Sequence, residues 1–108
     1  MAFYIVVHHP SDPVQPYHND WDPNNRTLRL IETRKDFVKE YWNELKPGAR
    51  IFVHRCGWGG NEPEITCSVE VDRHFDSSPY YISFKNTQPI NEKPKVVPVR
   101  GTGCYEYP

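Results

Sequence analysis

The chain has 108 residues, enough for one small hydrophobic core, so we expect a single domain over residues 1–108. Thirteen basic residues against fourteen acidic ones give a formal net charge of −1, which provides no global attraction to nucleic acid or anionic lipid. No apolar run reaches the roughly 20 residues of a membrane span, and the start has no signal-peptide features. We therefore expect a cytoplasmic protein without a membrane partner. An odd number of cysteines, three, favours reduced thiols over a disulfide framework.

Two strands and a long loop are predicted in the first third of the chain. Residues 2–8 form an apolar and β-branched run that ends at a proline, which is typical of a buried strand. Residues 10–25 contain four prolines, and a loop of this length in so small a domain is uncommon unless it has a function. Residues 27–32 alternate apolar and polar side chains and predict a short second strand.

The one main helix is predicted over residues 33–45. Thr33 offers an N-cap oxygen, and Asp36 follows three residues later as a capping-box acid. Proline and glycine at residues 47–48 end the helix. Its apolar side chains fall on one stripe, which consists of Phe37, Val38, Tyr41, Trp42 and Leu45.

A β-hairpin and two further strands are predicted after the helix. The arms are residues 49–56 and 65–71, joined by a segment rich in glycine, asparagine and proline. In the second arm the side chains expected to face the core are Ile65, Cys67, Val69 and Val71. Strands over 80–84 and 95–100 complete an α+β fold, in which the helix packs on a small curled mixed sheet or plugs a β-barrel.

Metal binding and catalysis have little support in the sequence. His54, Cys56 and Cys67 lie near the base of the hairpin, but structural zinc normally has four ligands with close-set pairs, and buried cysteines commonly act as small hydrophobes. We therefore expect no metal and no cofactor. The chain has no nucleophile elbow, phosphate loop or helix-borne histidine motif, so a small enzyme acting on a nucleotide-like substrate ranks behind a binding protein.

Aromatic residues are the more unusual signal, at 14% of the chain. Trp21 and Trp58 each lie in a polar loop where core packing gives no obvious reason for a large ring. Two interpretations stay open for each of them. The ring folds back as a lid over the core, or it presents a flat face to a planar ligand, since base stacking contributes about 1–3 kcal/mol per base.

Several segments resemble PUA-like domains. LKPGARIFV at residues 45–53 is similar to the helix end that leads into a barrel strand of that superfamily. FYIVV at 3–7, ITCSVEV at 65–71 and FDSSPYY at 75–81 resemble, in the same order, pieces of its EVE branch. The resemblance implies a small β-barrel with a pocket for a modified or flipped base, with Trp21 in the pocket and the Tyr80–Tyr81 pair near the binding face.

We predict from these features a non-catalytic binding module that recognises nucleic acid, including a modified or flipped base, by stacking and a few hydrogen bonds. The expected stacking residues are Trp21, Trp58 and Tyr80, and the expected polar readers are His8, Asp22 and Arg55. The alternative is a protein-interaction module, such as an inhibitor or accessory factor, whose exposed loop aromatics anchor a partner.

Overall fold

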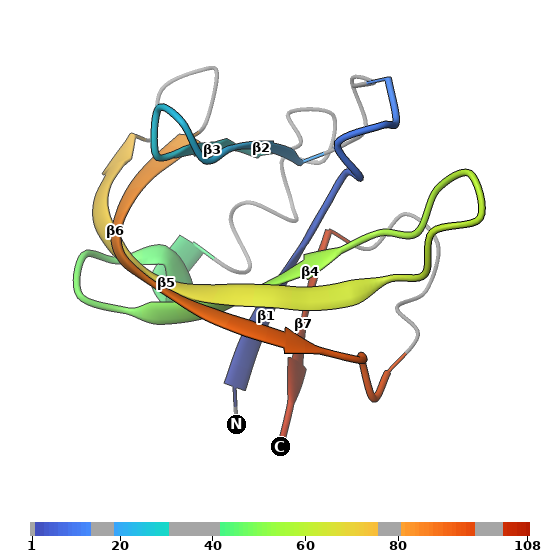
Figure 1. The fold of residues 1–108 in the computed structure, drawn as a ribbon. Helices are drawn as coiled ribbons and strands as arrows, with labels where there is room; N and C mark the ends of the chain where they lie inside the picture. The colour runs from blue at the N-terminus through green and yellow to red at the C-terminus, as the bar shows by residue number, and fades with distance from the viewer. Residues whose placement is uncertain (1, 14–18, 31–41, 76–80, 97–102) are drawn as a thin grey trace.

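One mixed β-sheet dominates the computed structural model, which describes residues 2–13, 19–30, 42–75, 81–96 and 103–108 (Figure 1). Its seven strands lie in the order β2-β3-β6-β5-β4-β1-β7. The strands are β1 (Ala2–Val7), β2 (Asp20–Asp22), β3 (Thr27–Arg29), β4 (Arg50–Arg55), β5 (Glu64–Phe75), β6 (Tyr81–Glu92) and β7 (Cys104–Tyr107). Within the described ranges the helical structure consists of a short 3-10 turn, η1 (Trp42–Leu45).

The predicted α+β class is wrong, because the regular secondary structure of the described residues is almost entirely strand and includes no α-helix. Of the predicted helix, residues 33–41 lie outside the described residues, and its end forms the 3-10 turn η1. A closed β-barrel is also wrong, since the sheet ends in two edge strands, β2 and β7. The physical reason is that the sheet covers its own inner face by curling, so that its core does not require a covering helix.

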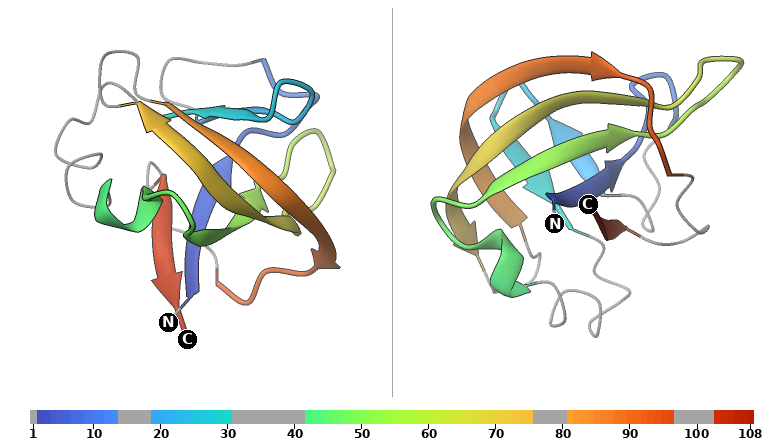
Figure 2. Two further views of the ribbon diagram at one scale, coloured as in Figure 1. Left: turned by 90° about the vertical axis from the view of Figure 1, so that its left-hand side faces the viewer. Right: turned by 90° about the horizontal axis from the view of Figure 1, so that it is seen from below.

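The curl comes from the two longest strands, β5 and β6, each of twelve residues. They bend so that β2 and β3 lie across from β1 and β4, as the views in Figures 1 and 2 show. The register between β5 and β6 shifts three times, and two of the shifts place an extra residue in β6, near Asn86 and Asn91. These two residues have φ of 51° and 58°, a conformation that asparagine tolerates better than most residues. Such bulges bend a strand and increase its twist.

The hydrophobic core fills the inner face of the curled sheet. Every strand except β2 contributes a buried side chain, and η1 contributes Leu45. The members of the core are Phe3, Ile5, Val7, Leu28, Leu30, Leu45, Ile51, Val53, Cys67, Val69, Val71, Ile82, Phe84 and Cys104.

The predicted alternation of the second hairpin arm is confirmed for three of its four members. Cys67, Val69 and Val71 belong to the core, but Ile65 does not. The register between β4 and β5 shifts at His54, so that Thr66 is an extra residue in β5. Because a one-residue insertion reverses the facing of the side chains beyond it, Ile65 turns to the outer face of the sheet.

The two ends of the sheet approach each other at one corner, and Asn19 joins them there. Asn19 is 2% exposed and directly precedes β2. Its Nδ2 donates one hydrogen bond to the carbonyl oxygen of Val6, at 2.9 Å, and another to that of Gly103, at 2.8 Å. The backbone N–H of Val6 also donates to the Gly103 oxygen, at 2.8 Å. The end of β1, the start of β2 and the approach to β7 therefore meet at one amide.

The turn between β2 and β3 generates a prediction for stability. Arg26 is exposed there and has a φ of 54°, a left-handed conformation that is unfavourable for arginine and open to glycine. We expect Arg26→Gly to raise the free energy of unfolding by about 0.5–1 kcal/mol in urea denaturation, because relief of the backbone strain exceeds the added entropy of the unfolded chain. Arg26→Ala is the matched control, since it removes the same side chain and keeps the strain. Equal stability of the two variants would contradict this explanation.

Candidate functional site

Trp21 packs against the core rather than standing free. It lies on β2 opposite Leu28 of β3, on the inner face of the sheet. Its ring stacks on that of Phe84, with centroids 4.5 Å apart and planes 6° apart. It also packs on the core cluster and is half-buried. The structure therefore supports the first interpretation of this residue, a lid over the core.

Trp58 stands at the tip of the hairpin between β4 and β5. Its backbone N–H donates to the oxygen of Asn61 at 3.1 Å, and the N–H of Asn61 donates back to the oxygen of Trp58 at 2.9 Å. The two residues between them, Gly59 and Gly60, have φ of 58° and 89°, so they form a two-residue turn of the type I′ class. Trp58 is 47% exposed and is the one large hydrophobic side chain in the described ranges that is so exposed.

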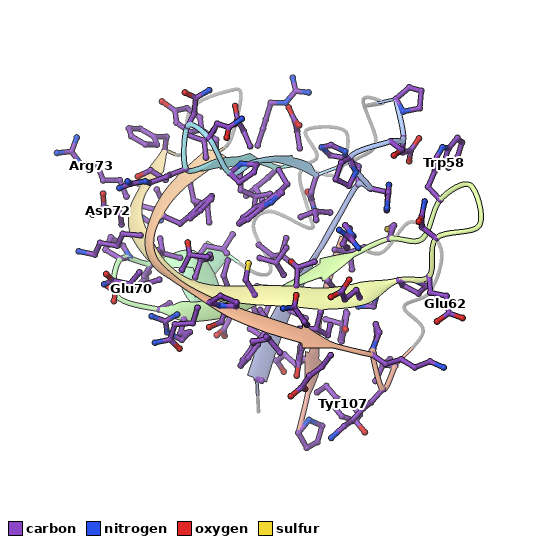
Figure 3. The ribbon with its side chains drawn as sticks, in the orientation of Figure 1. Trp58, Glu62, Glu70, Asp72, Arg73 and Tyr107 are labelled. Atoms are coloured by element: carbon purple, nitrogen blue, oxygen red, sulfur yellow. The ribbon has the colours of Figure 1, made fainter. Side chains whose placement is uncertain are left out.

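Close backbone packing fixes this tip further. A Cβ atom on Gly57 would lie 2.6 Å from the carbonyl oxygen of Asn61 and 3.1 Å from Cδ of Pro63. Gly57 is therefore required by space, whereas Gly59 and Gly60 are favoured by their positive φ. The three glycines around Trp58 thus define the backbone turn that presents its exposed indole. Figure 3 shows Trp58 and Glu62 pointing away from each other at this end of the molecule.

The three predicted polar readers bond to neighbours outside the predicted set. Nε2 of His8 lies 3.1 Å from Oδ1 of Asp20, and its Nδ1 lies 3.0 Å from the carbonyl oxygen of His9. Nη2 of Arg55 donates to Oε2 of Glu64 at 2.9 Å. His8 thus links the end of β1 to β2, and Arg55 pairs with the opposite arm of the hairpin.

Asp22 closes the turn between β2 and β3. Its Oδ2 accepts a hydrogen bond from Nδ2 of Asn25 at 2.7 Å, and its Oδ1 accepts one from the Asn25 backbone N–H at 3.1 Å. These bonds, the side-chain bond first, lower the pKa of the Asp22 carboxyl. Tyr80 lies outside the described residues. The described part of the predicted site is thus spread over β1, β2 and the β4–β5 hairpin, and the prediction that it acts as one site stays a prediction.

A second aromatic feature, which the sequence reasoning missed, lies on the outer face of the sheet. Phe52, Tyr4 and Tyr105 are register partners on the adjacent strands β4, β1 and β7. The rings of Tyr4 and Phe52 stack with centroids 5.0 Å apart, and those of Tyr4 and Tyr105 with centroids 4.9 Å apart. We call these three side chains the aromatic row.

A buried histidine holds one end of the aromatic row. His54 is 1% exposed, and its Nδ1 forms a hydrogen bond with the Tyr105 hydroxyl at 2.6 Å. Burial lowers the pKa of His54. Burial, with Tyr4 nearby, raises the pKa of Tyr105 to about 12. Both shifts favour the uncharged forms near neutral pH, so the hydrogen bond joins two neutral groups.

A pocket of about 80 Å³, the outer pocket, opens beside the aromatic row. Its walls combine the row with further apolar side chains, and its rim carries one acidic and two basic residues. The further wall residues include Ile65, Ile90, Val96 and Tyr107, and the charged rim residues are Glu92, Lys93 and Lys95. In Figure 3 Tyr107 lies below the sheet, on the side away from β2 and β3.

A polar groove of about 360 Å³ adjoins the outer pocket, and the two share Glu92 and Lys93. The groove runs along the base of the hairpin and includes the ion pair of Arg55 and Glu64. With Glu62 it holds three acidic residues and two basic ones. Its charge therefore has the opposite sign to that of the outer pocket's rim.

The aromatic row was missed because its members carry weak local signals. Tyr4 and Phe52 lie in apolar strands that were assigned to the core, and Tyr105 lies beyond the last predicted strand. One signal was available in the sequence. Residues 3–6 place aromatic side chains on both faces of the predicted strand, so each face should be either buried or functional.

The possible metal ligands of the hairpin do not form a cluster. Cys67 faces the core, while His54 bonds to Tyr105 on the outer face. Across the described ranges no group of three histidine, cysteine, aspartate or glutamate side chains is placed to hold a metal ion. All three cysteines are free thiols.

Comparison with protein-family models, with curated proteins and with solved structures finds no match to this chain. The resemblance to EVE-type domains therefore stays a prediction. Within the described ranges no helix is long and apolar enough to cross a membrane.

The buried pair on the outer face gives a prediction for pH dependence. The pKa of Tyr105 is raised from 10.0 to about 12, so the unfolded chain loses this proton before the folded chain does. The stabilisation is complete below pH 10 and is lost as pH rises toward 12. We expect the free energy of unfolding to fall more steeply with pH across this window in the wild type than in Tyr105→Phe, by urea denaturation. The two proteins differ only in this hydroxyl, so identical slopes would contradict the assignment.

Proposed function

We propose that this chain is a non-catalytic protein-interaction module, in which Trp58 inserts into a partner protein. The observation that carries the proposal is the 47% exposure of Trp58 on a turn that leaves its position defined. Tryptophan is enriched among the few residues that dominate binding energy at interfaces. An anchor that is already ordered before binding loses less entropy when the complex forms.

The charge of the hairpin favours a protein partner over nucleic acid at this tip. From Arg55 to Glu64 the chain has one basic residue and two acidic ones, Glu62 and Glu64. Arg55 is paired with Glu64, and Glu62 is exposed. Binding to nucleic acid depends on lysine and arginine contacts with phosphates, and this tip offers no surplus of positive charge.

The size of the indole is sufficient for an anchor. Covering the exposed half of a tryptophan side chain removes on the order of 100 Å² from water, which stabilises a complex by about 2–3 kcal/mol. Truncation of such an anchor weakens binding by about 2–4 kcal/mol, or roughly 30-fold to 1,000-fold. The free thiols of Cys56, Cys67 and Cys104 support a cytoplasmic setting for this interaction.

The test compares the proteins retained by immobilised wild-type chain and by Trp58→Ala. We expect specific partner proteins that bind the wild type in nuclease-treated extract and remain bound in about 0.5 M salt. The same partners should bind Trp58→Ala at least roughly 30-fold more weakly. Trp58→Phe should retain part of the binding, because it keeps a smaller ring on the same turn.

Lys85→Ala is the control for a surface substitution elsewhere, on β6. Equal retention by wild type and Trp58→Ala would overturn the proposal. Retention that disappears with nuclease or falls steeply with salt would favour the nucleic-acid prediction instead.

A further inference from the structure

We propose that the outer pocket is a second binding site, independent of Trp58, for a nucleotide. The base would enter beside the aromatic row, and the phosphate would lie against Lys93 and Lys95. The ligand chemistry is an aromatic ring that carries an anionic group, and it follows from the walls, the rim charge and the surroundings of the pocket.

The walls of the pocket suit a flat ring. Tyr4 is stacked on both sides, by Phe52 and Tyr105, so the ring faces that no member of the aromatic row covers are those at its two ends. Phe52 ends the row on the side of β5, where Ile65 of β5 and Ile90 of β6 also line the pocket. A ring placed there would extend the stack by one member, and stacking of a base on an aromatic side chain contributes about 1–3 kcal/mol.

The row is also held in place before a ligand arrives. The Tyr105 hydroxyl is hydrogen-bonded to the buried His54 at 2.6 Å, and the two rings meet edge to face with centroids 5.6 Å apart. Tyr4 is fixed between Tyr105 and Phe52 by the register of three adjacent strands. A rigid wall lowers the entropy lost when a planar ligand stacks on it.

The rim of the pocket selects an anion. Lys93 and Lys95 are exposed, and neither forms an ion pair with any residue in the described part of the chain. Among the side chains that line the pocket, the one carboxylate is that of Glu92. These side chains therefore carry a local excess of positive charge on a chain whose formal net charge is −1. An ammonium group binds phosphate as a point charge, which does not require a fixed approach.

The surroundings limit how much nucleic acid can follow the bound nucleotide. Beyond Glu92 and Lys93 the pocket continues into the polar groove, where Glu62 and Glu64 add negative charge. A phosphate backbone that continued along this groove would be repelled. The geometry therefore favours a free nucleotide or the end of a strand over the middle of a long one.

The experiment measures binding of defined probes to the full chain by NMR titration. The probes are the four nucleoside 5′-monophosphates, the matching nucleosides without phosphate, and six-residue single strands of each base. We expect at least one monophosphate to bind with a Kd below about 1 mM, and its nucleoside to bind at least roughly tenfold more weakly. The amides that shift should belong to β4, β7 and residues 93–96.

Variants separate the pocket from the rest of the surface. The double variant Lys93→Gln/Lys95→Gln should weaken the monophosphate at least roughly tenfold, and Phe52→Leu should weaken both monophosphate and nucleoside. Lys85→Gln is the matched control, because Lys85 is also an exposed lysine. It lies outside the pocket, on β6, with its Nζ 3.6 Å from carboxylate oxygens of Glu70 and Asp72. Trp58→Ala should leave nucleotide binding unchanged, so failure here and failure of the proposed protein interaction are distinguishable. Thermal melting checks that Phe52→Leu remains folded.

The probes also distinguish the two sources of the ligand. Monophosphates that bind as well as the strands would identify a free nucleotide, whereas strands that bind more than roughly tenfold tighter, with the same dependence on Lys93 and Lys95, would identify single-stranded nucleic acid. The proposal is overturned if neither kind of probe binds. It is also overturned if binding survives the double lysine variant and Phe52→Leu.

Discussion

Within the described residues, one curled sheet and a short 3-10 turn enclose the core, and the buried amide of Asn19 joins the two ends of that sheet. Its two N–H groups reach the carbonyl oxygens of Val6 and Gly103, which is 84 residues away along the chain. The Asn19 amide is itself buried, and a buried polar group that loses its hydrogen-bond partners costs about 1–3 kcal/mol. The Gly103 oxygen also accepts from the Val6 N–H, so that carbonyl keeps one bond without Asn19. The corner that Asn19 joins is where the two ends of the curled sheet approach each other, so the enclosure of the core depends on this contact.

The two faces of the curled sheet have different roles. The inner face is used up by the core, and Trp21 completes it by stacking on Phe84. Any binding must therefore use the outer face or the loops. The aromatic row and the outer pocket occupy the outer face, and Trp58 occupies a loop. The bulge at Thr66 connects the two faces, because it takes Ile65 from the core and places it in the outer pocket.

The sequence predicted most strands but not how they associate. Periodicity located β1, β3, β4 and the first parts of β5 and β6, and turn chemistry located the hairpin. Periodicity did not predict that β6 continues to Glu92 through Pro89. This is possible because, among the described strands, β6 pairs beyond Ser83 with β5 alone, and because it bulges at Asn86 and Asn91. The four-residue strand β7 is too short for a periodic signal, and the pairing of Tyr105 with Tyr4 depends on a long-range register. Of the candidate site, the exposure of Trp58 was one of two interpretations that the sequence left open, and the aromatic row could not be predicted without the strand order.

The central claim is that the Asn19 amide holds the curled sheet closed, and Asn19→Asp tests it most directly by urea denaturation at neutral pH. The substitution keeps the shape of the side chain but sets a carboxylate against two carbonyl oxygens, so the account predicts a loss of about 3 kcal/mol or more in the free energy of unfolding. Asn25→Asp is the control, because the Asn25 amide is exposed and bonds to Asp22 in a surface turn, and it should lose about 1 kcal/mol or less. An Asn19→Asp protein as stable as Asn25→Asp would contradict the account.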